Sequence, residues 1–285
     1  MNDRVTCQIL NYNDYKTTIK LIDNIVNYSI IDYVLVIDNE SENNSLFIIE
    51  SRYKTNDKVK VVSSGKNGGY GYGNNFGVNY AVQKLKSKYI IISNPDVAFD
   101  ESLVYKMIKI MKAKDAALVS GTQRINGIPV KRRAWRVPKP LEWATMEIGF
   151  QPKFYYPDDY YITKISKVEC VLGAMFMIDA QKFIKVSGYD EDMFLFCEET
   201  TLGFKFKEKG YSSYIINDKF YDHLHSATIG KSILSVVKRL KILYASEIIF
   251  DKKYQKMTLL EGFIVKSIFN LSILKNKVKK YLKKE

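Results

Sequence analysis

The segment Tyr89-Ile-Ile-Ile-Ser-Asn-Pro-Asp96 joins a short apolar run to a polar turn that carries a carboxylate. Its first five residues have the length and the β-branched content of a strand that is buried on both faces of a sheet. The Asn-Pro-Asp sequence then ends the strand, because asparagine and aspartate favour turns and proline donates no hydrogen bond to a ladder. We therefore predict a buried strand from Tyr89 to Ser93, with Asn94 and Asp96 at its carboxyl end.

Similar apolar runs alternate with longer segments on both sides of this strand. The other predicted strands are Val5 to Leu10, Tyr33 to Asp38, Lys58 to Val62 and Ala116 to Ser120. The predicted helices are Tyr15 to Asn27, Asn43 to Tyr53, Asn74 to Leu85 and Glu101 to Lys112. Strands and helices that alternate at this spacing indicate βαβ units, so we expect an α/β fold with a mostly parallel central sheet and flanking helices.

Polar residues follow four of the predicted strands. They are Asn11-Tyr12, Asp38-Asn39, Asn67-Gly68-Gly69 and Asn94-Pro95-Asp96. Turn formation or helix capping explains a single asparagine or aspartate at a strand end. Four such groups on one edge of a parallel sheet instead predict a polar crevice suited to a nucleotide and its phosphates, because ligands of these sheets bind beyond the carboxyl ends of the strands.

The segment from Asn67 to Gly77 contains five glycines and leads into a predicted helix. Glycines let the backbone approach a ligand closely, and the free N–H groups of a helix N-terminus bind anions. The segment is neither a Walker loop nor a dinucleotide fingerprint. The alternative is a flexible Gly/Tyr loop that binds no ligand.

The positive charge of the chain is concentrated near its C-terminus. The 285 residues include 44 Lys and Arg against 31 Asp and Glu, for a net charge of +13. From residue 231 onward there are 14 basic and 4 acidic residues, so residues 1–230 carry only +3. Basic and aromatic residues do mix between Lys131 and Arg136, but phosphate or sugar contacts explain them as well as nucleic acid does. We expect no nucleic-acid partner.

The composition is that of an ordinary globular protein, with 46% hydrophobic and 26% charged residues. No apolar stretch approaches the ~20 residues that span a bilayer, and no signal peptide precedes the first predicted strand. We therefore expect a cytoplasmic location. Cys7, Cys170 and Cys197 lie in apolar segments without metal-type spacing, which predicts buried, reduced thiols.

Two adjacent carboxylates, Glu198 and Glu199, follow the apolar run Met193-Phe-Leu-Phe-Cys197. Acidic residues are favourable in the first turn of a helix, which explains them without any function. A carboxylate that the apolar run partly desolvates beside the polar edge of the sheet also has the properties of a general base. Both interpretations fit the residues alone.

Several short motifs follow one another along the chain. They are Asn11-Tyr12, Asp38-Asn39-Glu40-Ser41, Asn67-Gly68-Gly69-Tyr70, Asn94-Pro95-Asp96, Gly173-Ala174, Gly188-Tyr189-Asp190-Glu191, Phe194 to Glu199 and His223 to Thr228. Their order resembles that of the inverting family 2 glycosyltransferases of GT-A fold, over roughly residues 5 to 230. The resemblance is closest to the bacterial rhamnosyltransferase-like branch, whose metal motif reads Asn-Pro-Asp.

The resemblance implies that a nucleotide-sugar donor lies in the crevice at the strand ends. The implied donor-binding residues are Asn11, Tyr12, Asp38, Asn39, Asn67, Gly69, Asn75, Asn94 and Asp96. In the family pattern Asp38 contacts the base or ribose, and Asn75 lies at the start of the phosphate region. Asp96 would hold Mg²⁺ or Mn²⁺ on the diphosphate, with His223 or His225 at the metal or the phosphates.

Glu199 occupies the position of the family's catalytic base, which takes a proton from the acceptor hydroxyl. This chain has the longer glutamate where an aspartate is usual, and Thr201 where a second acidic residue is often found. Glu198 is therefore the alternative base.

The C-terminal segment, residues 231–285, is expected to form a basic amphipathic extension to a glycosyltransferase domain of residues 1–230. Apolar residues recur in it with a helical period between lysines. Such helices pack on the body or on a second subunit of a homodimer, or lie on anionic lipid.

These features predict an inverting glycosyltransferase that builds a bacterial surface polysaccharide. The donor would be linked to dTDP or UDP, with rhamnose as the sugar, and the acceptor would be a lipid-linked saccharide or an oligosaccharide. The enzyme would then be peripheral at the inner face of the plasma membrane. The alternative is a catalytically idle GT-A-like domain that binds carbohydrate or scaffolds an assembly.

Overall fold

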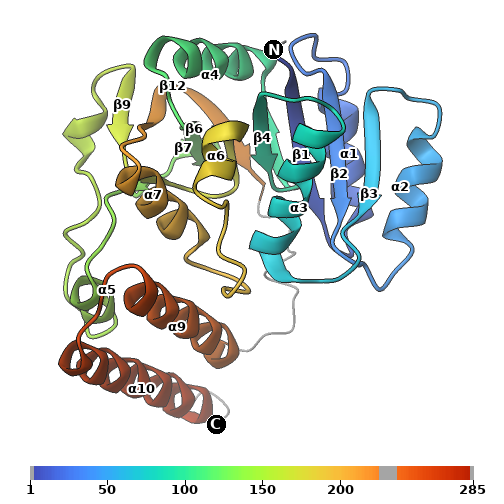
Figure 1. The fold of residues 1–285 in the computed structure, drawn as a ribbon. Coiled ribbons are helices and arrows are strands. Elements are labelled where there is room, and N and C mark those ends of the chain that lie inside the picture. Colours follow the sequence, from blue (N-terminus) through green and yellow to red (C-terminus); the bar gives the residue numbers. More distant parts are fainter. Residues whose placement is uncertain (1–2, 225–235, 283–285) are drawn as a thin grey trace.

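The computed structural model describes residues 3–224 and 236–282 (Figure 1). Most strands join one large mixed sheet: β1 (Val5–Asn11), β2 (Tyr33–Asp38), β3 (Val59–Ser63), β4 (Tyr89–Ser93), β5 (Val97–Phe99), β6 (Leu118–Ile125), β7 (Ile128–Pro129), β9 (Ile165–Val168), β11 (Met175–Asp179) and β12 (Ser213–His223). The order across this sheet is β3-β2-β1-β4-β11-β6-β12-β5, with β7 beside β6 and β9 beside β12. Two short strands, β8 (Ala134–Trp135) and β10 (Cys170–Val171), pair separately.

Helices cover both faces of the sheet. They are α1 (Tyr15–Ile25), α2 (Ser45–Tyr53), α3 (Gly69–Gln83), α4 (Glu101–Lys114), α5 (Pro140–Met146), α6 (Ala180–Lys185), α7 (Glu198–Glu208), α9 (Val236–Lys253) and α10 (Leu259–Leu282), with a 3-10 helix at Asp158–Tyr161. Side chains of α1, α2 and α4 share one apolar cluster with one face of the strands. Those of α3, α6 and α7 share a second cluster with the other face.

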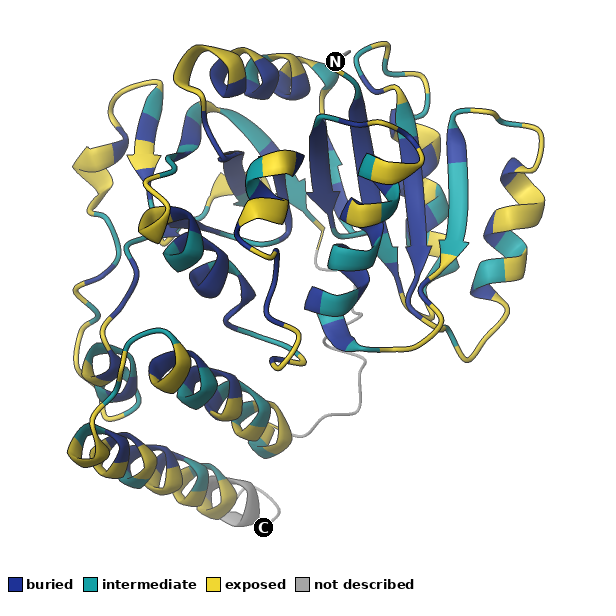
Figure 2. Ribbon diagram, in the orientation of Figure 1, coloured by how far each residue is buried: buried dark blue, intermediate teal, exposed yellow. Residues whose placement is uncertain are grey.

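The first half of the chain has the predicted architecture. Strands β3, β2, β1 and β4 are parallel (Figure 2). The central residues of β1, β2 and β4 are buried on both faces, whereas those of β3, at the edge of the sheet, are half-buried. In the second half β11 runs antiparallel to β4 and to β6, while β12 runs parallel to β6. The expectation of an α/β fold with a mostly parallel central sheet is therefore confirmed.

The glycine-rich segment differs from its expected form. We expected a loop before a helix that begins at Asn74, but α3 already begins at Gly69. An added Cβ would lie 2.4 Å from Leu10 at Gly73 and 2.5 Å from Gln8 at Gly77. These two of the segment's five glycines thus allow α3 to pack tightly on β1 and β2.

The three cysteines are free and buried, as the sequence predicted. No helix in residues 3–224 and 236–282 is both long and apolar enough to cross a membrane.

Helices α9 and α10 lie beside α5, on one side of the sheet domain (Figure 1). Phe250 of α9 is fully buried in a cluster with Val137, Cys170 and Met193. One face of α10 packs on α5 and α9. The boundary that we predicted near residue 230 falls in residues 225–235, outside the described residues, so the division into 1–230 and 231–285 stays a prediction.

Candidate active site

The carboxyl ends of β1, β2 and β4 meet at one edge of the sheet, as the sequence predicted. Asn11, the last residue of β1, is in register with Asp38 at the end of β2. Ile9 of β1 is in register with Ser93 of β4, so Asn94 follows on the same edge. The parallel ladder therefore brings together residues that are far apart in the chain.

Asp38 lies at the base of this edge and is only 1% exposed. Its carboxylate accepts hydrogen bonds from Asn11 Nδ2 at 2.7 Å, from the Ser41 N–H at 2.8 Å and from Ser41 Oγ at 2.7 Å. Thr18 Oγ1 donates to the amide oxygen of Asn11 at 2.8 Å. Asp38 and Asn11 thus hold the loop after β2 against β1, and the ring of Tyr12 beside them is 36% exposed.

Asn39 links the end of β2 to the start of α3. Its Nδ2 donates to Asn67 Oδ1 at 3.1 Å and to the Gly69 carbonyl at 3.2 Å. Gly69 has a φ of +89°, and a Cβ there would lie 2.3 Å from the carbonyl oxygen of Phe194. Only glycine meets both requirements, so the N-terminus of α3 can lie directly against the loop that precedes Glu198.

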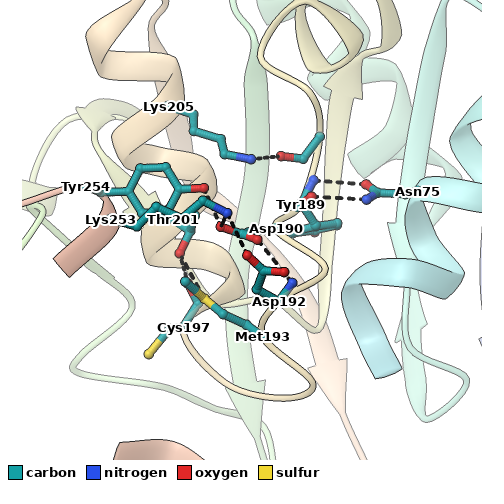
Figure 3. A network of polar contacts seen from close by, with 11 residues as sticks. Asn75, Tyr189, Asp190, Asp192, Met193, Cys197, Thr201, Lys205, Lys253 and Tyr254 are labelled. Atoms are coloured by element: carbon teal, nitrogen blue, oxygen red, sulfur yellow. Dashed lines mark hydrogen bonds and ion pairs between the residues drawn. The ribbon is translucent and has the colours of Figure 1, made fainter. Parts of the chain in front are cut away.

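Asn75 faces the Tyr189 backbone (Figure 3). Its Nδ2 donates to the Tyr189 carbonyl at 3.1 Å and to Glu191 at 2.8 Å, and its Oδ1 accepts from the Tyr189 N–H at 2.9 Å. The resemblance had placed Asn75 at the phosphates. In the structure both atoms of its amide join α3 to the segment before α7.

Asp96 and His223 lie side by side, although 127 positions separate them in the chain. Strands β5 and β12 pair with His223 opposite Val97, and the Leu224 N–H donates to the Asp96 carbonyl at 2.8 Å. His223 Nε2 is 3.2 Å from Asp96 Oδ1, and both side chains are mostly buried. His225, the alternative histidine, lies outside the described residues.

A carboxylate beside an imidazole is a fitting partial ligand set for a divalent cation. Oxygen donors suit Mg²⁺ and Mn²⁺, and imidazole suits Mn²⁺ as well. Within residues 3–224 and 236–282, no group of three or more His, Cys, Asp or Glu side chains could hold a metal ion by itself. Asp96 and His223 therefore fit a cation that takes its remaining ligands from the phosphates of a bound nucleotide and from water.

Glu199 lies over Gly173, in the turn that connects β10 to β11. A Cβ on Gly173 would be 2.1 Å from Glu199 Oε1, so this carboxylate occupies the space that a side chain would need. The next residue, Ala174, accepts a hydrogen bond from the Asn94 N–H at 2.8 Å. Glu199 is thereby attached to the same edge as the Asn-Pro-Asp turn, and burial raises its pKa above the ordinary range.

Glu198 is more deeply buried than Glu199, at 5% exposed. Its Oε1 has no hydrogen-bond partner among the described residues. Burial, and then repulsion from Glu199, raise the pKa of Glu198 to about 8. The two carboxyl groups thus do not ionise independently, and a proton on one favours ionisation of the other.

The loop before α7 is strained and tightly held (Figure 3). Phe196 and Cys197 both have positive φ, at 73° and 68°, which costs free energy in residues other than glycine. Thr201 Oγ1 donates to the Cys197 carbonyl at 2.8 Å and closes the first turn. Lys253 of α9 contacts Asp190 at 2.8 Å, so the C-terminal helices also support this loop.

Tyr70 is a site residue to which sequence reasoning gave no role. Its hydroxyl donates to the Gly173 carbonyl at 3.0 Å, and its ring meets Tyr189 edge to face at 5.7 Å. Burial, and then the charges of Glu199 and Glu198, raise the pKa of Tyr70 well above its ordinary value. Tyr70 thus lies close to the two carboxylates and holds the turn on which Glu199 rests. Its place after Asn67-Gly68-Gly69 was the available signal.

Most of the chain that forms this sheet edge matches a known enzyme family. The model of Glycosyl transferase family 2 matches residues 7–185, more than half of the chain. The chain therefore belongs to Glycosyl transferase family 2.

Two archaeal proteins are similar in sequence. The chain is 24% identical over 205 residues to the low-salt glycan biosynthesis hexosyltransferase Agl10 of Haloferax volcanii, a match that covers 70% of this chain and 60% of that protein. It is 23% identical over 231 residues to the uncharacterized protein MJ0544 of Methanocaldococcus jannaschii, covering 80% of this chain and 93% of that protein.

Solved structures share the fold. The crystal structure of GalNAc-T7 with UDP, GalNAc and Mn²⁺ aligns with a TM-score of 0.64 at 16% identity, over 78% of this chain and 44% of that one. S. aureus TarS 1–349 in complex with UDP-GlcNAc aligns with a TM-score of 0.54 at 14% identity, over 86% of this chain and 66% of that one. The fold is GT-A.

Proposed function

We propose that this protein is an inverting glycosyltransferase, which moves a sugar from a nucleoside diphosphate to a hydroxyl group of a saccharide acceptor. The observation that carries the proposal is the position of Glu199. A partly buried carboxylate lies on Gly173, next to the strand edge that ends in Asp96 and His223. This arrangement supports a base beside a diphosphate site, as direct displacement requires.

Glu199 is the proposed general base. It takes the proton of the acceptor hydroxyl, whose oxygen then forms a bond to the anomeric carbon from the face opposite the diphosphate. The bond from that carbon to the diphosphate oxygen breaks, and the nucleoside diphosphate leaves with the electron pair. One displacement inverts the anomeric centre, and the raised pKa of Glu199 makes it a stronger base than an exposed glutamate.

Asp96 and His223 are the proposed residues that hold Mg²⁺ or Mn²⁺ against the donor diphosphate. When bound, such a cation neutralises the negative charge that develops on the leaving diphosphate. The Mn²⁺ in the GalNAc-T7 structure supports a metal in this fold. The pairing of β5 with β12 brings His223 Nε2 to 3.2 Å from Asp96 Oδ1.

The donor is proposed to lie along the ends of β1 and β2, with its base near Tyr12 and its phosphates toward Asp96. Because Asp38 is buried and accepts three hydrogen bonds, it shapes this pocket through Asn11 and Ser41. UDP in the related structures supports a pyrimidine nucleotide. The Asn-Pro-Asp resemblance favours a dTDP-linked rhamnose over other sugars.

The proposed acceptor is a lipid-linked saccharide in the synthesis of a bacterial surface polysaccharide. The name of Agl10 links a relative to glycan biosynthesis. An acceptor of this kind is held in the membrane by its lipid, so the enzyme would act at the inner face of the plasma membrane.

The test of the base is Glu199→Gln, with Glu198→Gln as the matched control. Glutamine keeps the size of the side chain but cannot accept the proton, so turnover should fall by about 10²-fold or more. Donor binding, measured by calorimetry, should remain close to that of the unmodified protein. Near-normal turnover by Glu199→Gln, together with a large loss in Glu198→Gln, would move the base to Glu198.

A further inference from the structure

Helix α10 presents a row of exposed apolar side chains, which we call the α10 stripe. Its members are Leu260, Phe263, Ile264, Leu271, Leu274 and Val278. They recur at intervals of three, four and seven residues and therefore lie on one side of the helix. Their exposed fractions run from 37% at Ile264 to 71% at Phe263, far more than a helix shows on a face that packs.

The opposite side of α10 already has its partners. Val265, Ile268 and Phe269 are buried against α5 and α9. Phe269 stacks on Tyr244 at a centroid distance of 4.0 Å, and the Tyr244 hydroxyl donates to Ser272 at 2.8 Å. Because this side of α10 is fixed against α5 and α9, the helix cannot rotate to bury the α10 stripe without losing these contacts.

Lysines flank the stripe. Lys266 and Lys277 lie along one side of it and Lys275 along the other, and all three are exposed. Within residues 259–282, α10 carries one acidic residue, Glu261, and five lysines, so its net charge is positive. Two copies of this helix brought face to face would repel each other, whereas a surface of anionic phosphates would attract each one.

We propose that the α10 stripe docks on an anionic lipid bilayer. The helix lies in the plane of the membrane, its leucines and Phe263 enter the boundary between headgroups and acyl chains, and the flanking lysines contact lipid phosphates. A helix of this kind lies on the membrane and does not span it. The inference extends the proposed function, but the binding that it predicts needs no sugar transfer to be observed.

Contacts of α9 connect this surface to the active site. Ser246 Oγ donates to the Leu195 carbonyl at 2.8 Å, and Leu195 lies three residues before α7 begins at Glu198. Lys253 also contacts Asp192 at 2.8 Å (Figure 3). Because α9 holds the loop before Glu199 and also packs on α10, docking would set the height of the base above the membrane.

The experiment is cosedimentation of the full chain with vesicles. One set contains equal parts of phosphatidylglycerol and phosphatidylcholine, and the other contains phosphatidylcholine alone. Phe263→Ser is compared with Phe47→Ser on α2, because Phe47 is 70% exposed, almost the same as Phe263. We expect binding to the anionic vesicles, weaker binding without phosphatidylglycerol, and a loss of about tenfold in Phe263→Ser alone.

A charge pair of variants tests the lysines separately. Lys275→Glu with Lys277→Glu should reduce binding by more than tenfold, whereas Lys16→Glu with Lys20→Glu on α1 changes the net charge equally and should have a much smaller effect. Absence of binding to anionic vesicles, or equal loss in Phe263→Ser and Phe47→Ser, would overturn the proposal. The proposal would also be overturned if the full chain formed a dimer that Phe263→Ser dissociates, and if neither the dimer nor the monomer bound to vesicles. Donor-induced thermal shifts on the same variants report the active site independently.

Discussion

Replacing Gly173 with alanine should displace the proposed base and slow sugar transfer without removing any catalytic group. Gly173 carries no side chain, and its backbone is held by a hydrogen bond from the Tyr70 hydroxyl at 3.0 Å. An added Cβ would lie 2.1 Å from Glu199 Oε1 and 2.9 Å from its carboxyl carbon. Because the Gly173 backbone is held in place, the Glu199 carboxylate must move to make room for the Cβ.

The size of that movement sets the size of the effect. Carbon and oxygen atoms in contact lie roughly 3.5 Å apart, so the Glu199 oxygen must move by about 1 Å or more. A catalytic group misplaced by about 1 Å costs on the order of 10²-fold in rate, or roughly 3 kcal/mol of transition-state stabilisation. We therefore expect Gly173→Ala to approach the activity of Glu199→Gln.

The assay is release of nucleoside diphosphate from the donor that stabilises the protein best. Donor affinity is measured in parallel by calorimetry and folding by thermal unfolding. The control is Gly262→Ala on α10. A Cβ at Gly262 would lie 3.4 Å from Met257, which is an ordinary van der Waals contact. The reasoning fails if Gly173→Ala is folded, binds donor and turns over at the normal rate.

Three further predictions follow from the same site and its supports. Glu198 keeps its proton up to about pH 8, so Glu198→Gln removes no charge while Glu199 ionises, and the acidic limb of the pH–rate profile should keep its position; a shift of that limb would contradict this assignment. Burial raises the pKa of Asp251 from 3.8 to about 7. Between pH 3.8 and about pH 7, the Asp251 carboxyl therefore keeps its proton in the folded state and loses it in the unfolded state. The free energy of unfolding consequently falls as the pH rises through this range. Asp251→Asn should flatten this dependence and raise the free energy of unfolding at pH 8 by roughly 4 kcal/mol at most, measured by denaturant titration at several pH values. Asn75→Ala should cost about 1–3 kcal/mol of stability, because it leaves the Tyr189 backbone without its partner, while calorimetry finds donor affinity nearly unchanged.

The strands of the first half were predictable because local and global preferences agree there. Tyr33–Asp38 and Tyr89–Ser93 were predicted with the bounds that they have in the structure. Both are continuous β-branched runs that end at turn residues, so neither needs a distant partner to define it. The register of the parallel ladder then places Asn11 opposite Asp38, which gathers the strand ends in one site.

Longer-range features were not predictable in the same way. Strand β12 ends at His223 and is continuous only because β6, β9 and β5 pair with it, with a bulge between Ile216 and Phe220. Helix α3 extends back to Gly69 although local propensity opposes a helix there. Its first glycines lie against distant parts of the chain, where a Cβ would meet Phe194 at Gly69, Tyr189 at Gly71 and Leu10 at Gly73. Likewise, the place of Glu199 on Gly173 depends on a contact between α7 and the turn before β11.

The measurement that tests the account most directly is a thermal-shift panel of UDP- and dTDP-linked sugars, with and without Mn²⁺. It is applied to the unmodified protein, Asp96→Ala and Glu199→Gln. At least one nucleotide sugar should stabilise the unmodified protein more with Mn²⁺ than without it. Glu199→Gln should keep that stabilisation, and Asp96→Ala should lose it. Stabilisation by no nucleotide sugar, or an equal Mn²⁺-dependent shift in Asp96→Ala, would contradict the account.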